Sequence, residues 1–145
     1  GICYGQQLIC HKLGGKVEGC DNREYGKSML SIISDSEFFG DFWKKDYQYS
    51  VWMSHGDRVT SIPKGFNAIA VTENAPFAVI ENKEKNIYGL QFHPEVTHTL
   101  DGQSLISNFL LNIAKCNPNW NMHSFLEKKI NEIKSEIGNK KVICL

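Results

Sequence analysis

The first seven residues, Gly1-Ile2-Cys3-Tyr4-Gly5-Gln6-Gln7, decide the fold because they have the form of a nucleophile elbow. In that motif, usually G-x-S-x-G, the nucleophile lies on a sharp turn between a strand and a helix. A helix expected over residues 4–13 would aim its free N–H groups at the sulfur, which lowers a thiol pKa and stabilises an oxyanion. The sequence therefore predicts Cys3 as a nucleophile and the backbone N–H of Tyr4 as part of an oxyanion hole.

A second stretch, Gln91-Phe92-His93-Pro94-Glu95-Val96, offers a base and a carboxylate. His93 ends an apolar run expected to be a strand, and side chains at strand ends tend to face the cleft of open α/β sheets. Pro94 biases His93 toward an extended backbone, and Glu95 returns to the same side, where it can orient the imidazole. Cys3, His93 and Glu95 are therefore the candidate catalytic residues.

His55 competes with His93 for the role of base. It lies in Met53-Ser54-His55-Gly56-Asp57, directly after a strand expected over residues 49–53, but glycine rather than an acid follows it. Alternatively, this loop supplies backbone contacts to the amino-acid head of a substrate, with Gly56 allowing close approach. The residues themselves leave both roles open.

Short strands and turns fill the middle of the chain. Strands are expected over residues 29–33, 68–71, 78–81 and 87–92. A short aromatic helix should be capped by Asp35 or Ser36, and a longer one should span residues 105–114. In the helix over residues 4–13, the sequence predicts Leu8 and Ile9 on the inward face.

Beyond residue 116 the sequence changes in character. A linker-like stretch leads to a capping box at Ser124 and a helix with an apolar stripe, which we expect to pack on a neighbour. The stripe comprises Leu126, Ile130, Ile133 and Ile137. Residues 142–145 have the pattern of a buried strand. A chain that begins at a strand tip and stops on a strand is expected to be part of a longer protein.

Composition limits the partners. Sixteen basic and sixteen acidic side chains balance, which argues against a nucleic-acid or anionic membrane partner. No apolar run approaches the roughly 20 residues that span a bilayer. The five cysteines, at positions 3, 10, 20, 116 and 144, are odd in number and irregular in spacing. This disfavours a disulfide framework or zinc site, favours a reduced, cytoplasmic setting, and indicates apolar packing for all but Cys3.

The two motifs resemble those of the class I glutamine amidotransferases, whose triad is Cys-His-Glu. Residues 13–18, 51–57 and 91–99 resemble, within that family, the glutamine-hydrolysing GMP synthetases. The resemblance runs almost unbroken along the chain and implies a doubly wound, Rossmann-like α/β fold whose first strands precede Gly1. It also implies a glutamine amidotransferase domain over residues 1–116, and a linker helix and first strand of an ATP pyrophosphatase domain over residues 117–145.

The implied reaction is hydrolysis of glutamine to glutamate and ammonia, with Cys3 as nucleophile, His93 as base and then acid, and Glu95 as orienter. The implied glutamine pocket is lined by Gly5, Gln7, Ser54, His55 and Gly56. The ammonia would serve an ATP- and Mg²⁺-dependent amination of XMP to GMP in a synthetase domain. No cofactor or metal is expected in residues 1–145, and the full-length protein is expected to be a homodimer.

Three other functions stay open. The chain could be the amidotransferase subunit of another synthase, of the anthranilate or carbamoyl phosphate type, although such a subunit should end near the helix at 105–114. It could be a Cys-dependent peptidase or γ-glutamyl hydrolase, which would cleave glutamyl peptides rather than free glutamine. Finally, it could be a binding or dimerisation module in which Cys3 and His93 are relics.

Overall fold

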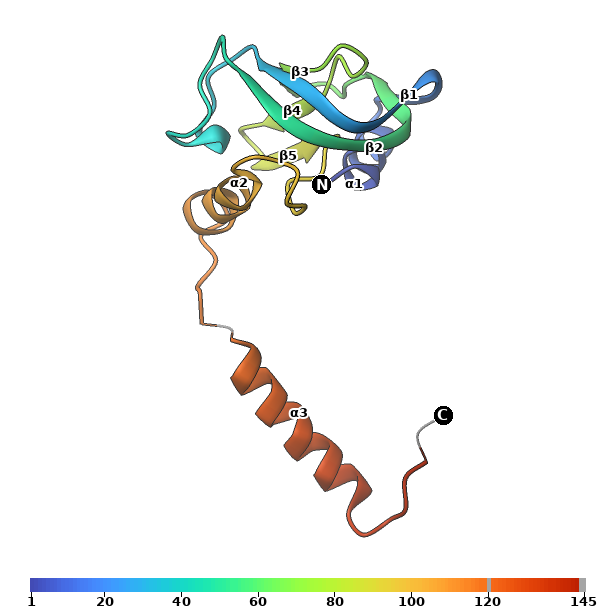
Figure 1. Cartoon of the computed structure of the whole chain (residues 1–145), viewed down its shortest axis with the longest axis vertical. Helices are drawn as coiled ribbons and strands as arrows, with labels where there is room; N and C mark the ends of the chain where they lie inside the picture. Colours follow the sequence, from blue (N-terminus) through green and yellow to red (C-terminus); the bar gives the residue numbers. More distant parts are fainter. Residues whose placement is uncertain (120, 144–145) are drawn as a thin grey trace. The chain divides into compact units, whose positions relative to one another are not determined.

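The chain divides into two units, residues 1–115 and residues 116–145, each described here by itself (Figure 1). The computed structural model describes residues 1–119 and 121–143, and only the backbone of residues 20–22. The first unit contains the sheet and the residues of the candidate site. None of the described helices combines the length and apolar character that a bilayer crossing requires.

A five-stranded sheet forms the centre of the first unit (Figure 1). Its strands are β1 (Lys16–Ile32), β2 (Gln48–Ser61), β3 (Asn67–Val71), β4 (Val79–Asn82) and β5 (Ile87–Leu90). They lie in the order β2-β1-β3-β4-β5, and each neighbouring pair is antiparallel. Doubly wound sheets are built on parallel strands. Within the described residues, parallel pairing is found at a bridge between Ile2 and Leu90.

Strands β3, β4 and β5 agree with those predicted from the sequence, whereas β1 and β2 are longer than predicted. β3 and β4 each lie within one residue of the expected bounds, and β5 ends two residues early. β1 also takes in the polar stretch at 18–27, which was not predicted as a strand. It forms because β1 pairs along β2, with a register shift between Gly19 and Glu24. β2 likewise continues to Ser61, so His55 lies within a strand and not after one.

Helix α1 (Tyr4–Lys12) buries polar side chains rather than the predicted leucine. Its buried residues are Gln6, Gln7 and Cys10, Ile9 is half-buried, and Leu8 is 42% exposed. The prediction for Leu8 was wrong because the inward face is used for hydrogen bonds: Gln6 Nε2 donates to the carbonyl of Phe77 at 2.6 Å. A Cβ on Gly89 of β5 would lie 2.7 Å from Gln6 Cγ, so this close approach requires glycine.

An aromatic core fixes the loop between β1 and β2. Ser36 caps the short helix η1 (Glu37–Phe39), as expected, by accepting from the backbone N–H of Phe38 at 3.2 Å. Phe38 stacks on Tyr88 with ring centroids 5.0 Å apart, and Trp43 stacks on Tyr49 at the same distance. Removing such a buried ring typically costs about 3–5 kcal/mol.

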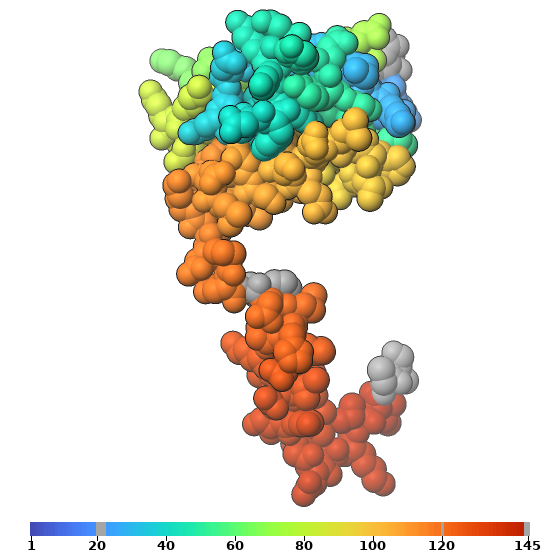
Figure 2. Space-filling model, turned by 60° about the vertical axis from the view of Figure 1, so that its left-hand side comes forward, coloured from blue at the N-terminus to red at the C-terminus, as the bar shows by residue number. Residues whose placement is uncertain are grey.

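The segment after β5 covers one side of the first unit (Figure 2). It contains helix α2 (Gly102–Asn108), which continues into the π-helical turn η2 (Phe109–Ile113). The helix predicted at 105–114 therefore begins three residues earlier and changes its hydrogen-bond spacing halfway. Gly102 permits the tight start, because a Cβ there would collide with the Pro94 carbonyl oxygen.

Helix α3 (Met122–Ile137) belongs to the second unit and buries none of its residues. It begins two residues before the predicted capping box, because the side chain of Asn121 accepts from Ser124 N at 2.8 Å. The expected packing of its apolar stripe is not found among the described residues: Leu126, Ile130 and Ile133 are exposed. The strand predicted at residues 142–145 is not found in its described part: Val142 and Ile143 are exposed, and no described strand pairs with them. Residues 144–145 lie outside the described residues.

The cysteines predicted to pack in apolar surroundings differ in their burial. Cys10 is fully buried, which confirms its predicted packing role, whereas Cys116 is exposed, so that prediction was wrong. Cys116 follows the end of η2, where it is not covered by other described residues. The side chains of Cys20 and Cys144 lie outside the described part of the structure.

Candidate active site

Cys3 lies on a strained turn between the bridge at Ile2 and the first turn of α1. Its backbone has φ 49° and ψ −106°, a positive-φ conformation that non-glycine residues rarely adopt. Such strain costs on the order of 1–3 kcal/mol and persists only where the surroundings enforce it. Here the backbone N–H of Cys3 donates to Leu90 O at 2.6 Å, and its carbonyl accepts from Gln6 and Gln7. The geometry is that of a nucleophile elbow.

The two glycines of the elbow have different roles. A Cβ on Gly1 would lie 2.6 Å from the carbonyl carbon of Gly5, so the turn closes only around glycine at that position. A Cβ on Gly5 would meet no atom within 4 Å. Gly5 therefore leaves open space at the start of α1, which is compatible with its predicted contact to a substrate.

The sulfur of Cys3 meets groups from β2 and from the segment after β5. Its S–H donates to Ser54 O at 3.7 Å, and Gln91 Nε2 donates to the sulfur at 3.7 Å. Burial raises the pKa of the Cys3 thiol, the Tyr4 backbone N–H and the Gln91 amide lower it, and the Glu95 charge raises it. The pKa is raised on balance, contrary to the lowering expected from the helix N-terminus, because burial outweighs the donors.

His93 and Glu95 form an ion-pair-type contact, with Nδ1 2.7 Å from Oε1. Because the carboxylate accepts the Nδ1 proton, Nε2 is the nitrogen that can take a proton from elsewhere. The backbone of His93 is held on both sides: its N–H donates to Trp52 O at 3.0 Å, and its carbonyl accepts from the Thr99 hydroxyl at 2.6 Å. The histidine is thus fixed against β2.

The three candidate catalytic residues are brought to one region but not into one hydrogen-bonded chain. The charge of Glu95 acts on the Cys3 sulfur, so the two lie within electrostatic reach. The hydrogen bonds of that sulfur go to Ser54 and Gln91, however, and not to His93. Catalytic hydrogen bonds are often loose in free enzymes and tighten when substrate binds.

His55 occupies a buried polar network instead of facing the sulfur. Its Nε2 lies 3.1 Å from Glu24 Oε2, its Nδ1 lies 3.1 Å from Asp57 O, and the residue is 5% exposed. Burial alone would raise the pKa of Glu24, but hydrogen bonds from His55, Ser28 and Thr72 hold it below its ordinary value. The acid that the local sequence lacked comes from β1. This arrangement favours a structural role for His55 over that of the base.

Of the other residues predicted to contact glutamine, Gln7 and Ser54 lie at the elbow, where both contact Cys3. Gln7 Nε2 donates to Asp57 O at 2.8 Å and to Gln91 Oε1 at 3.4 Å. Ser54 presents its carbonyl to the sulfur, and a Cβ on Gly56 would meet only the Arg23 side chain, at 3.8 Å. The contacts of Gly5, Gln7, Ser54, His55 and Gly56 with glutamine stay predictions.

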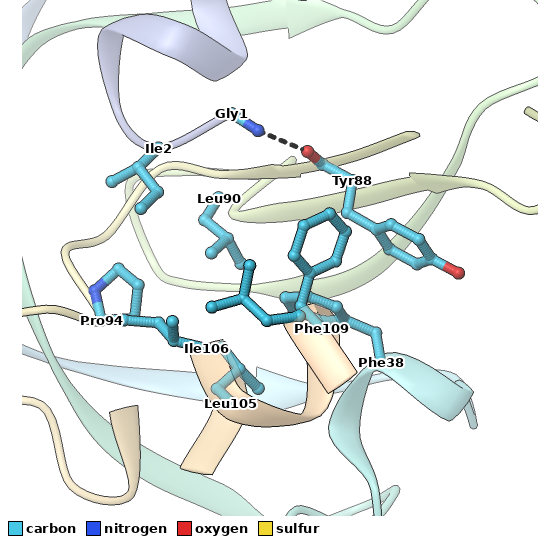
Figure 3. A pocket seen from close by; sticks show the side chains of 10 residues that line it. Gly1, Ile2, Phe38, Tyr88, Leu90, Pro94, Leu105, Ile106 and Phe109 are labelled. Atoms are coloured by element: carbon cyan, nitrogen blue, oxygen red, sulfur yellow. Dashed lines mark hydrogen bonds between the residues drawn. The ribbon is translucent and has the colours of Figure 1, made fainter. Parts of the chain in front are cut away.

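An apolar pocket of about 230 Å³ lies between the chain start, β5 and α2, but its walls carry none of the candidate catalytic residues (Figure 3). Leu90, Phe109 and Leu105 project into it, and the N-terminus of Gly1 donates to Tyr88 O at its edge. A second, open pocket of about 180 Å³ adjoins the elbow. Its lining residues are Tyr4, Gln7, Leu8, His11, Val17 and Asp57.

Three residues at the site were missed by sequence reasoning: Gln91, Thr99 and Glu24. Gln91 had a usable signal, since it lies two residues before His93 and therefore on the same side of an extended backbone. Glu24 gave none, because its partner His55 lies 31 residues away on another strand. Thr99 gave none either, because its hydroxyl accepts from the backbone N–H of Trp52, 47 residues away, while it donates to the carbonyl of His93.

Comparison with known proteins gives a family match over most of the chain. The family model described as "Glutamine amidotransferase class-I" matches residues 1–113. The chain is 49% identical over 144 residues to a GMP synthase [glutamine-hydrolyzing] of Rhizobium etli, covering 99% of the chain and 28% of that protein. It is 54% identical to that of Brachyspira hyodysenteriae over 99% of the chain and 27% of that protein. The chain thus spans less than a third of these relatives.

Solved structures give the same picture. A protein from Thermoplasma acidophilum, described as a GMP synthase subunit, matches with a TM-score of 0.73 and 29% identity, over 90% of this chain and 59% of that one. A glutamine amidotransferase from Thermotoga maritima matches with a TM-score of 0.58 and 27% identity, over 93% of this chain and 55% of that one. These likenesses confirm the predicted α/β fold.

Proposed function

Because the chain belongs to the class I glutamine amidotransferase family, we propose that Cys3, His93 and Glu95 hydrolyse glutamine to glutamate and ammonia. The observation that carries the proposal is the elbow. Cys3 holds a strained backbone with a positive φ at the N-terminus of α1, and Glu95, hydrogen-bonded to His93, lies within electrostatic reach of its sulfur. Strain of this kind is characteristic of functional sites.

In the proposed reaction, Cys3 Sγ attacks the side-chain carboxamide carbon of glutamine while His93 Nε2 accepts the thiol proton. The Tyr4 N–H stabilises the oxyanion, and His93 returns the proton to the departing ammonia. Water then attacks the thioester carbon while His93 Nε2 accepts its proton, the C–S bond breaks, and His93 returns the proton to Cys3 Sγ as glutamate leaves. Glu95 keeps the imidazole oriented and stabilises its protonated form.

The raised pKa of Cys3 supports a mechanism in which the thiol loses its proton to His93 as the sulfur attacks glutamine. Burial and the charge of Glu95 keep the pKa of Cys3 above its ordinary value, so a thiol rather than a thiolate is present near neutral pH. A ready-made thiolate–imidazolium pair is therefore not the resting state we propose. Substrate would bring His93 and the sulfur into contact.

We also propose that the ammonia is used to aminate XMP to GMP, with ATP and Mg²⁺ bound outside residues 1–145. In support, the relatives named above are GMP synthases, and each matches 99% of the chain. Residues 1–116 would be the glutamine amidotransferase domain, and residues 117–145 the linker helix and first strand of the ATP pyrophosphatase domain. A cytoplasmic homodimer is part of this proposal.

The experiment uses a GMP synthase that carries this sequence as its glutamine amidotransferase region. Cys3→Ala should abolish glutamine-dependent GMP formation and leave ammonia-dependent formation largely intact, because Cys3 serves only ammonia release. Cys116→Ala, at an exposed thiol, is the matched control and should retain both activities.

Other outcomes separate the alternatives. Equal loss of both activities in Cys3→Ala would mean that Cys3 is structural. Glutamine hydrolysis without any GMP formation would favour the amidotransferase of another synthase, of the anthranilate or carbamoyl phosphate type. Cleavage of glutamyl peptides, with free glutamine untouched, would favour a γ-glutamyl hydrolase.

A further inference from the structure

We propose that Gln91 is a catalytic residue whose side-chain amide stabilises the Cys3 thiolate, and that Gln7 is a positioning residue that fixes the direction of that amide. The inference rests on the proposed role of Cys3 as nucleophile. It concerns three side chains that join α1 to the segment after β5, through hydrogen bonds within one buried cluster.

The direction of each amide follows from a backbone carbonyl. Gln7 Nε2 lies 2.8 Å from Asp57 O, and because a carbonyl oxygen only accepts, the nitrogen of Gln7 must be the atom on that side. The same nitrogen has a second hydrogen to donate, and it lies 3.4 Å from Gln91 Oε1. Gln91 must then turn its own Nε2 toward Cys3 Sγ, 3.7 Å away.

Both amides are buried, which keeps this arrangement of hydrogen bonds in place. Gln91 is 1% exposed and Gln7 is 8% exposed, so water cannot readily replace either donor. A buried amide that lost its partner would leave a polar group unsatisfied, which holds the network in the single direction described above. The N–H of Gln91 is therefore a preorganised donor aimed at the sulfur.

The surroundings of the sulfur distinguish its two protonation states. As a thiol, Cys3 donates its proton to Ser54 O. Once that proton leaves, the sulfur only accepts, and the groups that favour it are the Gln91 amide and the Tyr4 N–H, against the opposing effects of burial and Glu95. Gln91 thus offsets part of the penalty for forming a thiolate beside a carboxylate.

The test measures alkylation of Cys3 by iodoacetamide against pH, read by peptide mass spectrometry in a GMP synthase that carries this sequence as its glutamine amidotransferase region. Gln91→Met keeps the length and removes the donor, and Gln91→Glu replaces the donor with an acceptor. We expect the apparent pKa of Cys3 to rise by about one unit in Gln91→Met, making alkylation near pH 7 about tenfold slower. Gln91→Glu should raise it further, and Gln7→Met should have a smaller effect of the same sign.

Two controls accompany these variants. Gln48→Met makes the same substitution at an exposed position of β2 and should leave the pKa of Cys3 unchanged. Alkylation of Cys116, an exposed thiol in every variant, should keep its rate and pH dependence. A general loosening of the fold would change the reactivity of the buried Cys10 as well, whereas loss of the donor would not.

An unchanged pKa of Cys3 in Gln91→Met, with the wild type hydrolysing glutamine, would overturn the inference and leave the proposed function standing. A raised pKa in a wild type that does not hydrolyse glutamine would support the inference and overturn the function. If Gln91→Met does not fold, as judged by thermal unfolding, Gln7→Met decides: an unchanged Cys3 pKa there would also overturn the inference.

Discussion

At the scale of single residues, the backbone of Cys3 has the geometry of a nucleophile elbow, whereas the surroundings of its sulfur raise the thiol pKa. The elbow sequence was enough to predict a nucleophile at a strand-to-helix turn, and the φ of 49° agrees with that prediction. The raised pKa of Cys3 could not be predicted, because it depends on burial and on Glu95 and Gln91, which are about 90 residues away.

His93→Ala is expected to lower the rate of glutamate release by about 10²–10⁴-fold, because Glu95, 2.7 Å from Nδ1 of His93, orients that ring as a base, whereas both ring nitrogens of His55 contact Glu24 or Asp57. Glu95→Gln should fall between the wild type and His93→Ala, since an amide keeps a hydrogen bond but loses the charge that stabilises imidazolium. Steady-state measurement of kcat checks both variants.

His55→Ala should instead lower the free energy of unfolding, because it removes one of the three hydrogen bonds that Glu24 accepts in a buried network, leaving those from Ser28 and Thr72. His123→Ala, on the exposed surface of α3, is the control and should change neither quantity. If His55→Ala lost as much kcat as His93→Ala while remaining fully folded, His55 and not His93 would be the base.

At the scale of elements, polar side chains tie β1 and β2 together where the pattern of the sequence indicated no strand. Glu24 and His55 lie opposite each other in the hairpin, and Thr72, just after β3, donates to Glu24 at 3.3 Å. The apolar strands β3 and β4 were predictable from composition. The polar half of β1 was not, because its stability comes from pairing with β2 and from buried hydrogen bonds.

Glu24→Gln is expected to destabilise the first unit by about 2 kcal/mol near pH 7, since it removes a charge that accepts three hydrogen bonds. The pKa of Glu24 is lowered by folding, so its contribution is complete above the unfolded value of 4.5 and is lost as the pH falls through the folded value. Urea unfolding at about pH 7 and about pH 3.5 should show the difference from the wild type shrinking at the lower pH.

A difference between the wild type and Glu24→Gln that stayed constant over this range would mean that the carboxylate charge contributes nothing to stability. Glu18→Gln makes the same substitution at an exposed position of β1. It should leave unfolding unchanged at both pH values, as most surface substitutions do.

At the scale of the whole molecule, the site is assembled from segments that sequence spacing does not connect. Cys3, Ser54 and Gln91 meet through hydrogen bonds to one sulfur, although they belong to the turn before α1, to β2 and to the segment after β5. The resemblance to a family was enough to predict that Cys3 and His93 belong to one site. Periodicity could not. It also predicted packing for the apolar stripe of α3, of which Leu126, Ile130 and Ile133 are exposed among the described residues.

The most direct test of the account treats a GMP synthase that carries this sequence with a diazoketone analogue of glutamine and locates the covalent label by mass spectrometry. We expect labelling at Cys3, protection by excess glutamine, and loss of labelling in His93→Ala but not in His123→Ala. Label spread equally over Cys3 and Cys116, insensitive to glutamine and to the His93 substitution, would contradict the claim that Cys3 and His93 form a glutamine-hydrolysing site.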